Sequence, residues 1–367
     1  MKITGIRSHV LQYDLDEELG YSQQYYLKRT THLVEITTDE GVVGWGECFG
    51  GGDIAFANKA IVERVIQPMV LGMDPLEREV IWHKVYNLLR DHGQKGMPIQ
   101  SLSGVDIALW DLAGKIHGVP VYRLLGGAFR ERIQVYGYGM MLQRVPDLKQ
   151  RFAAESAAIR DAGYKAMKMK IGRGVKEDIA LVETVRDAIG PEIGLMVDAN
   201  HAYTAREAIP LGRELERLGV AWFEEPVAPE DRQGYRDLCR ALDMPIAGGE
   251  GEFTRWGFRD LIHNRCVDVL QPEVCGLGGI TEYLKVRALA EAHFMLAALP
   301  DLPGGAHPVQ PMLEYDTTPN RFREELLLEP LRVGEQVKES GGTVGLPGGP
   351  GLGIEPDPDF IRHFSVS

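Results

Sequence analysis

The chain has 367 residues, of which 44% are hydrophobic and 25% are charged, and its formal net charge at pH 7 is −13. This length accommodates two domains, or one barrel with a smaller partner domain, and the composition suits a protein with a substantial core. The negative charge argues against nucleic acid and anionic membranes as partners, and neither a signal peptide at Met1 nor an apolar run near 18 residues is recognised.

The N-terminal part of the chain predicts a small α+β domain over residues 1–125. Residues 1–14 alternate as a strand would, and the runs His32–Thr37 and Val42–Glu47 are typical of a hairpin. Between them lies the polar, tyrosine-rich segment 17–30. Helical segments then dominate up to residue 118.

From residue 126 to about residue 330, short apolar strands alternate with helix-like segments. Charged residues end or closely follow these strands at separations of 23 to 28 residues, the length of one strand, one helix and two loops. Such repeats imply a parallel sheet, and a closed (β/α) barrel is the leading candidate. The six strands expected first cover residues 133–138, 166–171, 194–198, 221–224, 245–247 and 267–270.

Three carboxylates, Asp198, Glu224 and Glu250, follow three successive predicted strands. The active site of such a barrel lies at the carboxyl ends of its strands, so these side chains should converge. Oxygen ligands suit Mg²⁺, or alternatively Mn²⁺, whereas Zn²⁺ would favour His or Cys. Any one of these acids alone could be solvated or paired with Lys or Arg, but three at matched spacing favour a metal site.

Lys168 and Lys170 are two residues apart on one predicted strand, so both side chains should point into the barrel. Met167 and Met169 alternate with them, as the outer, helix-facing side requires. Two neighbouring ammonium groups and partial burial lower a lysine pKa, which would let one lysine act as a neutral base near pH 7. The alternative is an ordinary surface pair that neutralises nearby acids.

Together these groups predict metal-assisted abstraction of a proton next to a carboxylate, with a lysine as the base and the metal stabilising the enediolate. A lysine base combined with Mg²⁺ is the known arrangement of enolase-type sites. A di-metal hydrolase is disfavoured, because no His-x-His sequence ends an early strand.

The sequence resembles the mandelate racemase subgroup of the enolase superfamily over nearly its whole length. Within that subgroup it is most similar to galactarolactone cycloisomerases and related sugar-acid enzymes. The motifs that carry the resemblance include Lys168-Met169-Lys170, Val197-Asp198-Ala199-Asn200, Phe223-Glu224-Glu225-Pro226, Gly249-Glu250 and Gly278-Gly279-Ile280-Thr281.

The resemblance implies a (β/α)7β-type TIM barrel over residues 126–330, capped by the N-terminal domain. Residues 331–367 would return to the cap, and segments 17–30 and 49–53 would close over the substrate. We expect a homo-oligomer. The four cysteines, Cys48, Cys239, Cys266 and Cys275, form no CxxC pair, so we also expect reduced thiols and a cytoplasmic location.

Two departures from the family pattern concern the strands that lie opposite the lysines in the barrel. Glu273 stands where the family has an Asp that supports a histidine on the seventh strand, and that strand is not recognisable in the sequence. Our hypothesis is that roughly 20 residues are omitted between His293 and Phe294, which a Cα–Cα distance well above about 3.8 Å would reveal. Alternatively, Phe294–Leu299 is itself a shortened seventh strand. His307 is the nearest remaining histidine, and we expect it to be structural.

We therefore expect a Mg²⁺-dependent lyase or isomerase of the cycloisomerase or dehydratase type, acting on a sugar acid or its lactone. The alternative is a metal-binding barrel that has lost catalysis and serves as a binding or scaffold protein. The expected catalytic residues are Lys170, Lys168 and Glu273, and the expected metal ligands are Asp198, Glu224 and Glu250. The candidate substrate contacts are Asn200, His201, Tyr21 and Tyr138.

Overall fold

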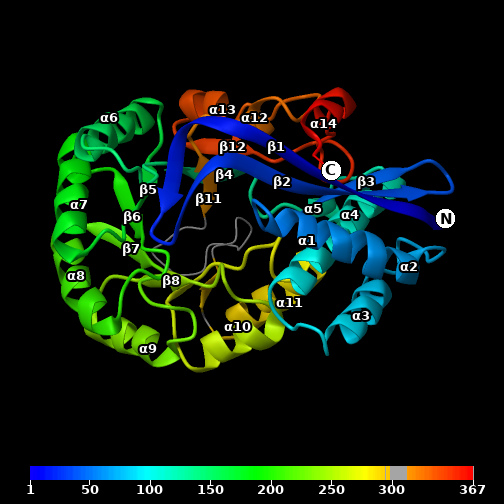
Figure 1. The fold of residues 1–367 in the computed structure, drawn as a ribbon, viewed down its shortest axis with the longest axis horizontal. Coiled ribbons are helices and arrows are strands. Elements are labelled where there is room, and N and C mark those ends of the chain that lie inside the picture. Colours follow the sequence, from blue (N-terminus) through cyan, green and yellow to red (C-terminus); the bar gives the residue numbers. More distant parts are fainter. Residues whose placement is uncertain (294, 298–311, 367) are drawn as a thin grey trace.

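The structure, a computed structural model, describes residues 1–293, 295–297 and 312–366. A sheet-and-helix cap lies beside a barrel ringed by helices, and both chain ends lie on the cap (Figure 1). Within the described ranges, no helix combines the length and apolar character that crossing a membrane requires.

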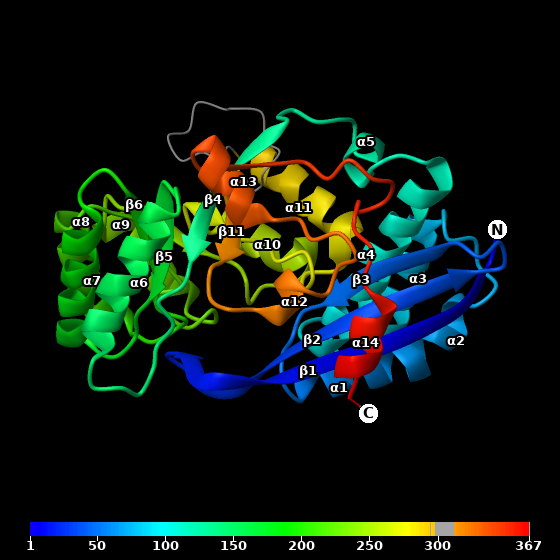
Figure 2. The ribbon, with the colours of Figure 1, turned by 90° about the horizontal axis from the view of Figure 1, so that it is seen from above.

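The cap starts with an antiparallel sheet of β1 (Ile3–Tyr21), β2 (Gln24–Thr38) and β3 (Val43–Cys48). Strands β1 and β2 form one long hairpin that extends from the cap across to the barrel (Figure 2). The strand expected over residues 1–14 therefore continues to the hairpin tip. The polar segment 17–30 did not reveal this continuation, because its side chains are exposed or only partly buried and show no apolar alternation.

The helices of the cap pack against one face of this sheet. Helix α4 (Met97–His117) contacts β3 closely: a Cβ on Gly46 would fall 2.1 Å from the Gly104 carbonyl oxygen, so only glycine fits there. The elements in chain order are α1 (Ile54–Ile61), the π-helical turn η1 (Val62–Ile66), α2 (Gln67–Val70), α3 (Arg78–Leu89), α4 (Met97–His117) and α5 (Val121–Leu124).

Among the described residues, the barrel has eight parallel strands, hydrogen-bonded in the order β10-β9-β8-β7-β6-β5-β4-β11. The strands are β4 (Arg132–Tyr138), β5 (Ala166–Lys170), β6 (Gly194–Asp198), β7 (Val220–Glu224), β8 (Ile246–Gly248), β9 (Val269–Leu270), β10 (Leu296–Ala297) and β11 (Met312–Asp316). The outer helices are α6 (Leu148–Asp161), α7 (Val175–Ile189), α8 (Ala205–Arg217), α9 (Arg232–Ala241), α10 (Thr254–His263) and α11 (Gly279–Ala292).

The side chains of β5 confirm the predicted alternation. Met167 and Met169 are fully buried in the large cluster between strands and helices. Lys168 and Lys170 take the alternate positions and point into the barrel. A smaller inner cluster fills the barrel, formed by Tyr136, Ala166, Met196, Trp222, Ala247 and Val269.

The seventh position of the barrel is occupied by β10, which pairs in parallel with β9. The expected absence of a seventh strand is therefore not confirmed, and the alternative of a shortened strand within Phe294–Leu299 describes the fold. The test of an omission, the distance from His293 to Phe294, falls outside the described residues, as does His307.

The C-terminal segment first covers the barrel and then returns to the cap. Its elements are α12 (Arg321–Glu324), α13 (Val333–Ser340), β12 (Thr343–Gly345) and α14 (Pro358–Phe364). Strand β12 pairs antiparallel with β4. Helix α14 packs Phe360 and Phe364 onto Leu11 and Leu33 of the cap sheet, as expected for a tail that returns to the cap.

Candidate active site

The two lysines of β5 meet carboxylates from the next two strands. Lys168 and Lys170 are only 3% and 6% exposed. Lys168 Nζ lies 2.6 Å from Glu224 Oε1, and Lys170 Nζ lies 2.5 Å from Asp198 Oδ2. Strand register explains these pairs, because Lys170 is aligned with Asp198 and Asp198 with Glu224. Two of the three carboxylates predicted from strand ends, Asp198 and Glu224, therefore lie beside the lysines.

The carboxylates change the protonation expected for the lysines. Burial lowers the pKa of Lys168, but Glu224 and Glu314 together raise it well above its usual value. For Lys170, burial again lowers the pKa, and Asp198 raises it above its usual value. The expectation of a lowered lysine pKa is therefore wrong for the metal-free chain, because attraction to the acids outweighs burial and repulsion between the ammonium groups.

The acids are affected in different ways. For Asp198, burial raises the pKa, but Lys170 and Lys168 lower it more, so the group is held ionised. Burial raises the pKa of Glu224 to about 7 in spite of Lys168. Burial, opposed by Lys170, also raises the pKa of Glu250, and the charge of Asp198 adds to the rise. These carboxylates therefore form a like-charged cluster that is only partly neutralised by the lysines.

The donor chemistry of Asp198, Glu224 and Glu250 fits a hard divalent cation, because all three offer carboxylate oxygens from adjacent strand ends. Lysines engage Asp198 and Glu224, whereas Glu250 has no hydrogen-bond or ion-pair partner among the residues that the structure describes. Among the residues that the structure describes, no three His, Cys, Asp or Glu side chains are gathered closely enough to hold a metal ion. Binding would require the lysine–carboxylate pairs to open.

Glu273 lies on the side of the barrel away from the lysines. Its Oε1 accepts a hydrogen bond from the Cys275 backbone N–H at 2.8 Å. Burial raises its pKa to about 7, and the charges of Glu250 and Glu47 contribute. No histidine of the described chain contacts it, so its expected role in a dyad stays a prediction.

All four cysteines carry free thiols.

Two tyrosines flank the lysines as candidate substrate contacts. The Tyr138 ring centroid lies 5.1 Å from Lys170 Nζ and 5.4 Å from Lys168 Nζ. The Tyr21 ring, from the end of β1, lies 5.9 Å from Lys170 Nζ. Both rings therefore border the space above the ammonium groups.

Asn200 and His201 follow β6 with positive φ angles of 42° and 67°, which turn the chain sharply after Asp198. The Asn200 N–H donates to Asp198 Oδ1 at 2.9 Å, and His201 Nε2 lies 3.3 Å from Glu225 Oε2. Asn200 Oδ1 is buried and lacks a hydrogen-bond partner within the described residues. An unpaired buried acceptor is costly, so Asn200 is available to accept a hydrogen bond from a ligand hydroxyl.

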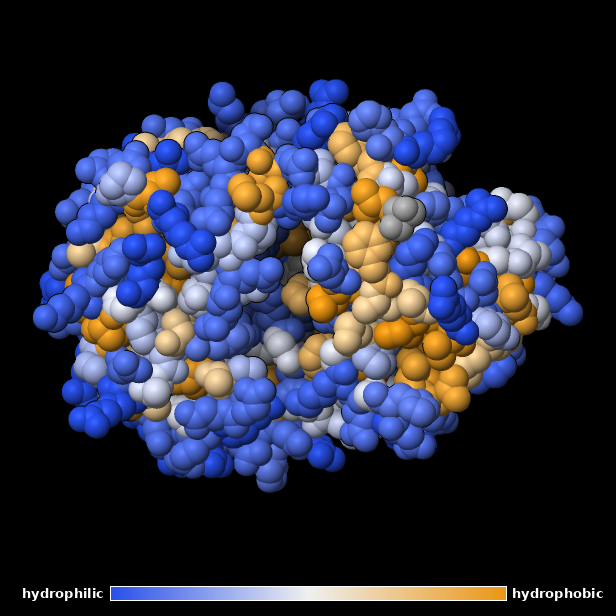
Figure 3. Space-filling view, viewed as in Figure 1, coloured by the Kyte–Doolittle hydropathy of each residue, from blue (hydrophilic) through white to orange (hydrophobic). Residues whose placement is uncertain are grey.

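The tip of the β1–β2 hairpin covers this edge of the site. Ser22 Oγ donates to the carbonyls of Ala199 and Asn200 at 2.7 and 2.8 Å, and Gln23 Nε2 donates to the Asn200 carbonyl at 3.0 Å. The surface is hollowed near its middle, between barrel and cap (Figure 3). The hairpin tip is therefore fastened to the turn that follows β6.

Sequence reasoning missed Glu314 as a site residue. Glu314 Oε2 lies 2.6 Å from Lys168 Nζ and accepts a hydrogen bond from Tyr136 Oη at 2.7 Å. Gln271 was also missed; its Nε2 donates to Glu224 Oε2 at 2.7 Å. The signal available for Glu314 was its position in a short apolar run near the expected end of the barrel.

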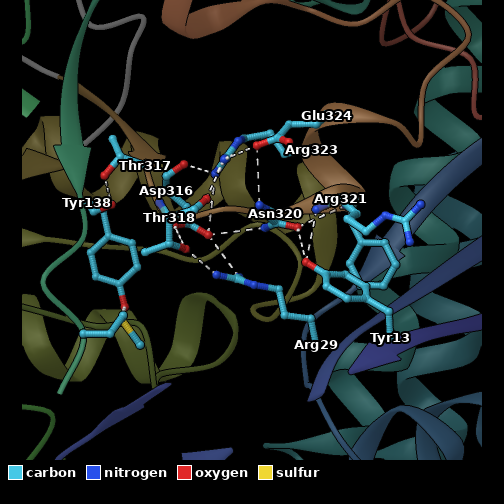
Figure 4. Close-up of polar contacts among 12 residues, drawn as sticks. Tyr13, Arg29, Tyr138, Asp316, Thr317, Thr318, Asn320, Arg321, Arg323 and Glu324 are labelled. Atoms are coloured by element: carbon cyan, nitrogen blue, oxygen red, sulfur yellow. Dashed lines mark hydrogen bonds and ion pairs between the residues drawn. The ribbon is translucent and has the colours of Figure 1, made fainter. Parts of the chain in front are cut away.

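A polar network at the end of β11 attaches the hairpin to the strand that carries Glu314 (Figure 4). Arg29 of β2 pairs with Asp316 Oδ2 at 3.0 Å and donates to Thr318 Oγ1 at 2.5 Å. Arg323 donates to the Thr318 carbonyl at 2.6 Å. The hairpin of the cap thus contacts the end of β11 as well as the turn after β6.

Comparison with known proteins agrees with this architecture. Residues 22–126 match the mandelate racemase / muconate lactonizing enzyme N-terminal domain, and residues 151–360 match the enolase C-terminal domain-like family. A D-galactarolactone cycloisomerase of Agrobacterium fabrum (strain C58) is 41% identical over 386 aligned positions, covering 100% of this chain and 99% of the relative. The alignment is 19 positions longer than the chain of 367 residues, so it contains gaps in this chain.

Two solved structures are similar over the full chain. A 3,6-anhydro-D-galactonate cycloisomerase from Zobellia galactanivorans has a TM-score of 0.87 and 34% identity, with 100% of both chains covered. An L-talarate/galactarate dehydratase mutant liganded with Mg and L-glucarate has a TM-score of 0.87 and 27% identity, covering 100% of this chain and 92% of the other. The chain therefore belongs to the enolase superfamily, in its mandelate racemase / muconate lactonizing enzyme family.

Proposed function

We propose that the protein is a Mg²⁺-dependent lyase or isomerase that removes the proton next to the carboxylate of a sugar acid or its lactone. The observation that carries this proposal is the pair of buried lysines on β5, facing carboxylates on β6 and β7. The relatives support the substrate class, since two are named as sugar-acid cycloisomerases and a third holds Mg and L-glucarate.

In this proposal Asp198, Glu224 and Glu250 hold the ion. The bound ion supplies positive charge that stabilises negative charge on the substrate carboxylate. Those three acids are also among the groups that raise the lysine pKa values. For Lys170, once their charge is compensated, burial and the neighbouring ammonium of Lys168 remain, and both of these lower the pKa.

Lys170 is the proposed base, because its partner Asp198 is an expected ligand and the Tyr21 and Tyr138 rings border its ammonium group. Lys168 stays paired with Glu314, so it would remain charged and tune Lys170. Asn200 and His201, at the β6–α8 turn, would contact substrate hydroxyls. A homo-oligomeric state and a cytoplasmic location remain predictions beside this proposal.

The test is turnover of purified protein with Mg²⁺ on a panel of aldarates and aldarolactones. Reactions run in D₂O should place deuterium at the carbon next to the carboxylate, detected by NMR. The product separates the two reaction types, since a dehydratase loses water and a cycloisomerase yields an isomer. Absence of both turnover and exchange across the panel, with Mg²⁺ bound, would favour a binding barrel without catalysis.

A further inference from the structure

Glu250 sits inside a tight turn whose end is anchored. The Glu252 N–H donates to the Gly249 carbonyl at 3.0 Å, which places Glu250 and Gly251 at the two central positions of a four-residue turn. Gly249 has a φ of 126°, a conformation that favours glycine. The direction in which the Glu250 carboxylate leaves this turn therefore depends on what holds Glu252.

Glu252 is a buried acid, 2% exposed, held from two domains. Its Oε1 pairs with Lys95 Nζ at 2.6 Å and accepts the Phe253 N–H at 3.0 Å, and its Oε2 pairs with Arg232. Lys95 belongs to the cap loop between α3 and α4, whereas Arg232 begins α9 of the barrel. A Cβ on Gly257 would fall 2.2 Å from Glu252 Oε1, so this glycine leaves room for the carboxylate.

The neighbouring residue strengthens the attachment to the cap. Phe253 follows Glu252 in a loop of the barrel, yet its ring packs against the apolar core of the cap. A salt bridge and an apolar contact therefore fasten the same loop to the cap, immediately after the turn that carries Glu250.

We propose that Glu252 is a positioning residue, through which Lys95 of the cap and Arg232 of the barrel fix the turn that carries Glu250. This inference rests on the proposed function, in which Glu250 is a metal ligand. Partners outside the ligand set orient the ligands of protein metal sites, and their loss typically lowers metal affinity about 10–100-fold. The cap would then contribute to the metal site without touching the ion.

The test measures Mg²⁺ affinity by calorimetry on the full chain, without substrate, for Lys95→Met, Glu252→Gln and Lys95→Arg. Lys95 is 59% exposed, so its loss should leave the fold intact. The matched control is Glu79→Gln, which removes another cap–barrel ion pair, with Lys285 at 2.8 Å, away from the turn. Thermal unfolding of every variant shows whether it is folded.

We expect Lys95→Met and Glu252→Gln to weaken Mg²⁺ binding about tenfold or more. The conservative variant Lys95→Arg should largely retain Mg²⁺ binding, and the control Glu79→Gln should leave it unchanged. Wild-type affinity in a folded Lys95→Met protein would overturn the inference while leaving the proposed function standing. If the wild type binds no Mg²⁺, the metal assignment fails, and this inference falls with it.

Discussion

The two sides of the barrel mouth differ in strand length and in the pairing of their charged side chains. Strands β5, β6 and β7 have five residues each, and they end in lysines and acids that pair with one another at 2.5–2.6 Å. Strands β8, β9 and β10 have three, two and two residues. On that side Glu250 has no hydrogen-bond or ion-pair partner among the described residues. Glu273 accepts a hydrogen bond from the Cys275 backbone, and the nearby charges of Glu250 and Glu47 are also acidic.

This difference indicates where the chemistry should reside. Long strands fix the direction of their terminal side chains through many ladder hydrogen bonds, and the ion pairs add further order to those side chains. Short strands leave the end of the barrel to loops. We therefore expect the lysine side to carry the proton transfer and the opposite side to contribute less, which mutations on each side can test.

The largest effect is expected for Lys170→Ala. Removing the base should lower deuterium exchange next to the substrate carboxylate by about 10²–10⁴-fold. Mg²⁺ binding, measured by calorimetry, should persist, because Lys170 is not a ligand. Lys176→Ala, at an exposed lysine of α7, is the control. Unchanged exchange in the Lys170 variant would move the base to another residue.

Asp198→Asn should mainly affect the metal. Losing a ligand charge should weaken Mg²⁺ binding by more than the about 10–100-fold typical of partners outside the ligand set. Titration of the variant with Mg²⁺ by calorimetry measures this directly. An affinity equal to that of the wild type would show that the ion, if bound, does not use the end of β6.

Glu273→Gln tests the opposite side. If the lysine side carries proton removal, exchange should fall by less than about 10²-fold, below the usual range for losing an acid or base. The comparison with Lys170→Ala under identical conditions is the measurement. A loss as large as that of the lysine variant would show that both sides take part equally.

The smallest expected effect is on the pH dependence of stability. The Glu273 pKa is raised to about 7 by burial, with Glu250 and Glu47 contributing and Cys275 opposing. The folded state therefore binds this proton more tightly than the unfolded state, whose carboxyl has its ordinary pKa near 4.5. This contribution to stability is present at low pH and is lost as pH rises through about 7.

Glu273→Gln stays neutral at every pH, so it should unfold at a higher temperature than the wild type above pH 7, by about 2 °C. The two proteins should converge below the ordinary carboxyl pKa of 4.5. Parallel thermal melts in matched buffers provide the measurement. An identical pH profile for both proteins would contradict the raised pKa.

The sequence predicted the lysine side well, because alternation and repeat length determine which strand ends meet. Met167 and Met169 marked the outward face of β5, so the inward direction of the lysines followed. The protonation of those lysines could not be predicted in the same way. It depends on the distances to Glu224 and Glu314, and Glu314 lies more than 140 residues further along the chain.

The opposite side was harder to predict for physical reasons. Two-residue strands such as β9 and β10 carry too little alternation to define a period, which is why the seventh strand could not be recognised. The Lys95–Glu252 contact joins two domains, and no local spacing encodes it. The length of the β1–β2 hairpin was also missed, because its polar outer part shows no apolar alternation.

Helix α14 has a consequence for how the chain is made. The Val366 N–H donates to the Val10 carbonyl at 2.9 Å, and Phe360 and Phe364 cover Leu11 and Leu33. Helix α14 can therefore cover the first strand of the cap only after about 350 further residues have been synthesised, which takes roughly 20–70 s at ribosomal speed. During that time the nascent cap presents an apolar patch to chaperones, so the domain translated first is the last to be finished.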